Sequence, residues 1–96
     1  MKIVVKNIEM IAEFYNYRDE YNIGQVKIRP RRFRVLLDDD NERKVINIDR
    51  ILNIEEEGTK NDSRIVFHCK SLLNNLMTQY IIKYQKNNTK WILFKM

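Results

Sequence analysis

The stretch YIIKYQKNNTKWILF, residues 80–94, decides the predicted fold. Side chains alternate with a period of two on both sides of Asn87-Asn88, which is typical of β-strands. Asparagine tolerates the positive φ of a two-residue hairpin turn, so Asn87-Asn88 is the predicted turn. This register places two cross-strand pairs on one face: Tyr84 with Trp91, and Ile82 with Leu93. Aromatic and branched pairs of this kind stabilise a sheet, so we predict an antiparallel hairpin.

A second hairpin is predicted upstream, with Asp38 to Arg43 as its connection. The inward-facing positions shift by one residue between Ile28 and Phe33, and Pro30 lies at the shift. Because proline cannot donate a hydrogen bond to a sheet, the sequence predicts a bulge or kink there. The predicted register gives two inward and two outward pairs: Val35 with Ile46 and Phe33 with Ile48, then Arg32 with Asp49 and Arg34 with Asn47.

The rest of the chain also favours strands. A further strand is predicted from Arg64 to Leu72, after a polar, mobile loop from Glu55 to Asp62. Residues 8–17 fit a helical face and a strand equally well, and the β-propensity of their tyrosines favours a strand.

These elements predict an all-β fold with five to six antiparallel strands in a bent meander, closing toward a small barrel or a half-open roll. Residues 1–96 form a single small domain, with residues 1–7 as an extension or the first strand. Twelve residues make up the predicted core, the last two capping one end: Val26, Ile28, Phe33, Val35, Ile46, Ile48, Ile65, Phe67, Ile82, Leu93, Tyr84 and Trp91.

Composition indicates the cellular compartment and the kind of partner to expect. No apolar stretch approaches the ~20 residues of a membrane span, and the amino end is too short for a signal peptide. The single cysteine, Cys69, rules out an internal disulfide and fits the reducing cytoplasm. The formal charge of +5 favours an anionic partner, although a lysine- and asparagine-rich chain can arise from AT-rich coding alone.

A search for reactive groups finds none. His68 and Cys69 are adjacent in a predicted strand, so their side chains point to opposite faces and cannot form a nucleophile pair. Zinc needs three or four ligands, and a phosphate loop needs more glycines than Gly24 and Gly58. The acidic run Asp38–Asp40 lacks the glycine and terminal acid of a calcium loop. We predict a protein that is not an enzyme, with no cofactor, metal or small-molecule substrate.

Several segments carry a family resemblance. They are Ile28–Arg34, Val45–Ile51, Val66–Ser71, Tyr80–Tyr84 and Lys90–Leu93, in this order and spacing. The chain resembles, over roughly residues 8–96, a family of short uncharacterised proteins from low-GC Gram-positive bacteria. The resemblance implies a compact β fold and a strand at residues 8–14, and it implies no activity.

Two functions fit these observations. The first is an accessory or protein-interaction module, working with a protein partner or by self-association through a sheet edge or a Tyr/Ile-rich face. The alternative is a nucleic-acid-binding small barrel, in which Arg29, Arg31, Arg32 and Arg34 contact phosphates. Tyrosines would then stack on bases: Tyr15, Tyr17 or Tyr21.

Overall fold

The chain folds into seven β-strands and no helix in the part that the computed structural model describes, residues 1–17, 25–36 and 43–96. The strands are β1 (Ile3–Tyr17), β2 (Gln25–Leu36), β3 (Arg43–Asn47), β4 (Arg50–Thr59), β5 (Asp62–Leu73), β6 (Leu76–Gln85) and β7 (Lys90–Lys95). The all-β prediction is therefore confirmed, with one or two more strands than expected. The segment that could have been a helix is β1, which also includes Ile3–Asn7.

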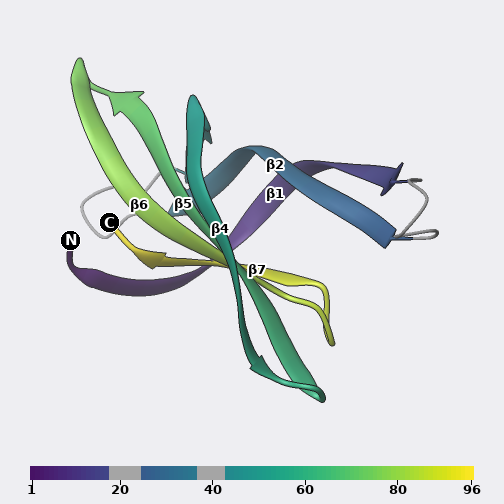
Figure 1. Ribbon diagram of the computed structural model, residues 1–96. Helices are drawn as coiled ribbons and strands as arrows, with labels where there is room; N and C mark the ends of the chain where they lie inside the picture. Colours follow the sequence, from purple (N-terminus) through teal and green to yellow (C-terminus); the bar gives the residue numbers. More distant parts are fainter. Residues whose placement is uncertain (18–24, 37–42) are drawn as a thin grey trace.

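All seven strands belong to one antiparallel sheet in the order β3-β2-β1-β7-β6-β5-β4 (Figure 1). The two edge strands, β3 and β4, are consecutive in the chain and are joined by Ile48-Asp49. Ile48 N–H donates to Arg31 O of β2 at 2.9 Å, and Asp49 N–H donates to Lys70 O of β5 at 3.2 Å. This joint draws the two edges together, so the sheet curls into a half-barrel.

The core lies inside the curl. Eight of the twelve predicted core residues are buried, and Ile28, Ile48 and Ile65 pack against them half-buried; the side chain of Val26 lies outside the description. The predicted core did not include Ile8 and Tyr80, which complete the same cluster together with Cys69, a residue whose side chain the strand pattern directs inward. Tyr80 is one of the largest of these side chains and packs edge-on against Phe33, with ring centroids 5.5 Å apart.

The C-terminal hairpin has the predicted register, with Tyr84 opposite Trp91 and Ile82 opposite Leu93. Its turn differs from the prediction, because the positive φ falls on Thr89, at 56°. The two-asparagine turn occurs instead at Asn74-Asn75, between β5 and β6, where φ is 49° and 64°. Both pairs of asparagines can adopt this conformation, and strand register decides which pair does.

The β2–β3 hairpin differs from the prediction by two residues: Phe33 lies opposite Ile46, and Arg32 lies opposite Asn47. The predicted Arg32–Asp49 pairing is therefore wrong, and Asp49 Oδ2 accepts a hydrogen bond from Leu72 N–H at 2.7 Å instead. A two-residue slip keeps every side chain on its original face, so the inward pattern cannot distinguish the two registers. The acidic run Asp38–Asp40 lies outside the described residues.

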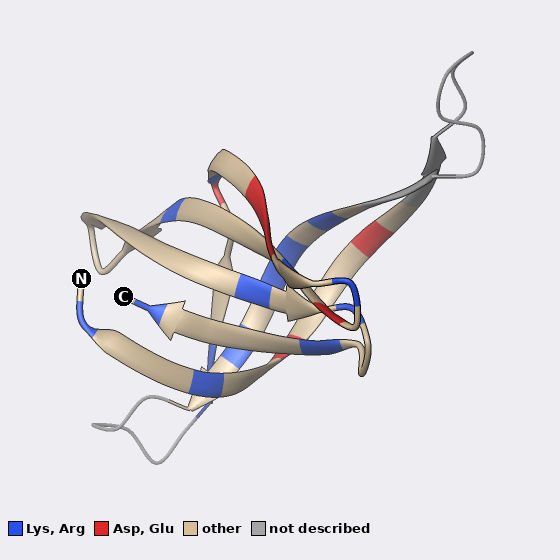
Figure 2. Cartoon of the chain, turned by 60° about the horizontal axis from the view of Figure 1, so that its bottom comes forward, with Lys and Arg blue, Asp and Glu red and all other residues tan. Residues whose placement is uncertain are grey.

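The predicted mobile loop from Glu55 to Asp62 is also wrong, because Glu55–Thr59 completes β4 and pairs with β5. Cations from β6 and the turn that follows it hold the glutamates in the sheet, as Lys83 Nζ contacts Glu57 Oε1 at 2.7 Å and Lys86 Nζ contacts Glu56 Oε1 at 3.1 Å. The hydrogen bond from Lys83 lowers the pKa of Glu57, although desolvation acts in the opposite direction. Figure 2 shows that such Lys and Arg positions are spread over most of the sheet.

Candidate interaction surface

A β-bulge divides the predicted arginine segment between two surfaces. Ile11 of β1 lies opposite Arg32 while Ala12 lies opposite Pro30, so Arg31 is the extra residue. Pro30 is buried, which agrees with the predicted irregularity at this proline. As a result Arg32 and Arg34 belong to the outer face of β1–β2–β3, whereas Arg29 lies on the other side of the bulge.

Three arginines near this segment are paired with glutamates of β1. Arg31 Nε lies 2.6 Å from Glu13 Oε1, and Glu9 accepts hydrogen bonds from both Arg34 and Arg43. The hydrogen bond from Arg34, with the charges of Arg34 and Arg43, holds the pKa of Glu9 below its ordinary value against a smaller effect of desolvation. Half of the predicted phosphate-binding arginines are thus engaged within the protein itself.

Arg29 and Arg32 are exposed, and they differ from these three arginines in their ion pairing. Within residues 1–17, 25–36 and 43–96, neither has a carboxylate at ion-pair distance. The structure therefore brings two of the four predicted arginines into local ion pairs and leaves two available to a partner.

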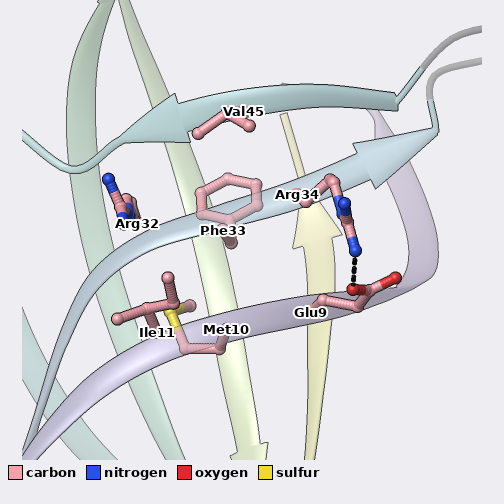
Figure 3. A pocket seen from close by; sticks show the side chains of 7 residues that line it. All are labelled: Glu9, Met10, Ile11, Arg32, Phe33, Arg34 and Val45. Atoms are coloured by element: carbon pink, nitrogen blue, oxygen red, sulfur yellow. Dashed lines mark hydrogen bonds and ion pairs between the residues drawn. The ribbon is translucent and has the colours of Figure 1, made fainter.

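The outer face carries a shallow hollow of about 510 Å³ beside Arg32 and Arg34 (Figure 3). Ile11 and Val45, on the strands either side of β2, are 54% and 60% exposed there. Figure 3 shows Arg34 directed toward Glu9 at one end of this hollow and Arg32 at the other. Seven residues line it, and we call them the outer-face patch: Glu9, Met10, Ile11, Arg32, Phe33, Arg34 and Val45. Met10 and Phe33 pack on the core side and form its floor, whereas the other five side chains point outward.

Arg29 lines a second hollow, of about 680 Å³, between β2 and the start of β4. Ile28 forms part of the β2 side, and the segment from Asp49 to Ile54 forms the other. Leu52 and Ile54 are exposed in this hollow, which opens where β2 and β4 diverge beyond the Ile48-Asp49 joint.

The remaining reactive residues have structural roles. Cys69 is buried in the core, and burial raises the pKa of its thiol to about 12, so the thiol stays protonated at neutral pH. His68 points to the opposite face, as predicted, with Nε2 3.6 Å from Glu55 Oε2, which is too long for a hydrogen bond. No group of three or more His, Cys, Asp and Glu side chains in the described ranges could hold a metal ion.

Sequence reasoning did not identify Glu9 and Glu13 as partners of the arginines. Their positions follow from the β1–β2 register, which depends on how the two strands pair and not on a local pattern in either strand. The tyrosines predicted to stack on bases lie where side chains are not described: Tyr15, Tyr17 and Tyr21.

No family model matches the chain, and comparisons with curated proteins and with solved structures gave no match either. The family resemblance in the sequence therefore stays a prediction. The part of the chain covered by the structure has no helix of the length and apolar character needed to cross a membrane.

Proposed function

We propose that this protein is a small, non-catalytic protein-interaction module that binds a partner through the outer-face patch. The observation that carries the proposal is the exposure of Ile11 and Val45 on the two strands that flank β2, with Arg32 and Arg34 of β2 between them. Exposed apolar side chains beside arginine are typical of protein–protein contact sites, in which arginine is enriched.

The ion pairs favour a protein partner over nucleic acid. Phosphate recognition relies on guanidinium groups that are free to pair with the negatively charged phosphates of the nucleic acid. Arg31 and Arg34 are each paired with a glutamate, and an approaching phosphate would meet Glu9 and Glu13 as well. A protein partner can place its own polar groups against these Arg–Glu pairs and its apolar side chains against Ile11 and Val45.

The charge of the patch points to a different protein as the partner. Arg32, Arg34 and Arg43 outnumber Glu9, so this face is positively charged. A symmetric contact between two copies through the same face would place cations opposite cations. The expected partner surface combines apolar side chains, to cover Ile11 and Val45, with acidic ones, to face the arginines of β2. We place this module in the cytoplasm, and its single, buried cysteine supports a reducing compartment.

Photo-crosslinking tests the proposal. With a benzophenone amino acid in place of Val45, we expect one dominant crosslinked product in cells that express the protein naturally, because Val45 is an exposed apolar residue of the patch. The matched control carries the same amino acid at Asn87, an exposed turn residue far along the chain. Mass spectrometry identifies the product. Equal labelling at the two positions, or no product from Val45, would contradict the proposal.

Nucleic-acid binding is the second candidate, and the observation that favours it is the unengaged state of Arg29 and Arg32 within the described ranges. Under the interaction-module proposal, single-stranded nucleic acid should bind no tighter than ~10⁻⁴ M at physiological salt. Fluorescence anisotropy at three salt concentrations measures this affinity.

Nucleic-acid binding through these arginines would give a different result in the same titration. If the two arginines contact phosphates, the logarithm of affinity falls with the logarithm of salt with a slope of roughly 1.4, because each phosphate contact contributes about 0.7. Replacing Arg29 and Arg32 by alanine would then abolish that slope, whereas alanine at Lys86 and Lys90 would leave it unchanged. That pair of results would replace the interaction module with the nucleic-acid barrel.

A further inference from the structure

β4 is an edge strand of ten residues, whereas the opposite edge, β3, has five. One side of β4 pairs with β5 from Arg50 to Thr59, with a register shift at Leu52, and in the described part of the chain no strand lies on its other side. Leu52 and Ile54 are 44% and 55% exposed on it, and the hollow shared with Arg29 keeps that side open. A long edge with exposed apolar residues and unpaired backbone groups is a template for another strand.

The charges of β4 are arranged along its length in a self-complementary way. The strand begins with Arg50, which has no carboxylate at ion-pair distance among the described residues, and its second half is Glu55-Glu56-Glu57. Two such strands running parallel in register would place like charges opposite each other, which is unfavourable. Two strands running antiparallel would place the arginine of each copy near the glutamates of the other.

Two of the three glutamates can take a new cation readily. Among the described residues, the contacts of Glu55 are with Asn53 Nδ2, at 3.0 Å, and His68 Nε2, at 3.6 Å, neither of which is a permanent charge. Glu56 contacts Lys86 in a pair whose side chains are 70% and 42% exposed, an arrangement that contributes little to stability. Glu57 is held by Lys83 and Arg64 and is the least available.

We propose that β4 pairs antiparallel with β4 of a second copy, about a two-fold axis near Asn53. Arg50 of each copy then lies beside the Glu55-Glu56 segment of the other, with Glu55 on the same face as Arg50, because their partners on β5 are Val66 and Lys70. Leu52 and Ile54 of the two copies meet at the centre. The pairing satisfies the free backbone edge and joins two half-barrels into one continuous sheet. It uses a different surface from the outer-face patch, so the dimer can still bind the partner proposed above.

Sedimentation equilibrium on charge-reversal variants tests this dimer. The wild-type chain should sediment at twice its monomer mass. Arg50→Glu, and separately Glu55→Lys with Glu56→Lys, should each raise the dissociation constant roughly tenfold or more, because two cross-strand contacts change from attraction to repulsion. An equimolar mixture of the two variants, one of them fluorescently labelled, should recover wild-type affinity as a heterodimer, since every contact is again between opposite charges.

Controls separate this interface from general effects of charge. Lys90→Glu, a reversal on β7 at an exposed position, should leave the dissociation constant unchanged, and thermal melting should show that every variant is folded. A wild-type chain that remains monomeric at millimolar concentration would overturn the proposal. A dimer that is indifferent to the reversals, or is not restored by mixing, would overturn this interface in favour of another.

Discussion

Replacing Trp91 by alanine is expected to lower the free energy of unfolding by about 3–5 kcal/mol, a large part of what a domain of this size has. Trp91 is 9% exposed and stacks against Phe67 with ring centroids 5.8 Å apart. Its ring also lies 4.6 Å from that of Tyr84, its cross-strand partner. The substitution therefore removes two aromatic contacts and leaves a cavity between β5, β6 and β7. Urea denaturation monitored by far-UV circular dichroism measures the loss.

Phe14→Ala is the matched control for this prediction. Phe14 is also aromatic and in a strand, yet it is 60% exposed, so its truncation should cost less than about 1 kcal/mol. A Trp91→Ala protein with the midpoint of the wild type would show that the packing of this hairpin is not what stabilises the fold.

Ser71→Ala is expected to cost about 2–4 kcal/mol, an unusual loss for the removal of one oxygen atom. Ser71 is fully buried, and its hydroxyl donates to Asn47 O at 2.6 Å. Its only hydrogen is used there, so the Tyr80 hydroxyl, also 2.6 Å away, must donate to Ser71 Oγ. Alanine would leave the buried Tyr80 hydroxyl without its acceptor, at about 1–3 kcal/mol, and would also remove the part-buried hydrogen bond to Asn47 O, worth about 1 kcal/mol.

A double-mutant cycle separates this network from simple loss of packing. Tyr80→Phe should cost only about 1 kcal/mol, because the Ser71–Asn47 hydrogen bond remains. The double variant should be more stable than the sum of the single losses predicts, since the phenylalanine leaves no orphaned hydroxyl. Strict additivity, measured by urea denaturation, would show that the three groups do not act as a unit.

This network lies at the point that closes the half-barrel. Asn47 ends β3, Ser71 belongs to β5, and the adjoining Ile48-Asp49 segment bonds to both β2 and β5. The Asn47–Ser71 bond therefore connects β3, at one edge of the curled sheet, to β5, the strand next to the other edge. Burial also raises the pKa of the Tyr80 hydroxyl, which keeps it a donor over the whole neutral range.

The candidate site was only partly readable from the sequence. The clustering of the arginines and the irregularity at Pro30 were visible, because proline in a strand and a shift in apolar parity are local signals. The engagement of Arg31 and Arg34 was not visible, because Glu13 and Glu9 are 18 and 25 residues away in the chain. The surface on which each arginine lies depends on the β-bulge and on the strands that flank β2.

The sequence by itself determined that this chain is a β protein and how its C-terminal hairpin pairs, because a period of two and cross-strand partners within a few residues are local properties. It also separated inward from outward side chains, as for Phe33, Val35 and Ile46. Only the tertiary structure decided the β2–β3 register, since a slip of two residues keeps the same faces. It also decided that Glu55–Thr59 is a strand, because Lys83 and Lys86, which neutralise those glutamates, come from strands and turns that the local pattern cannot place beside them.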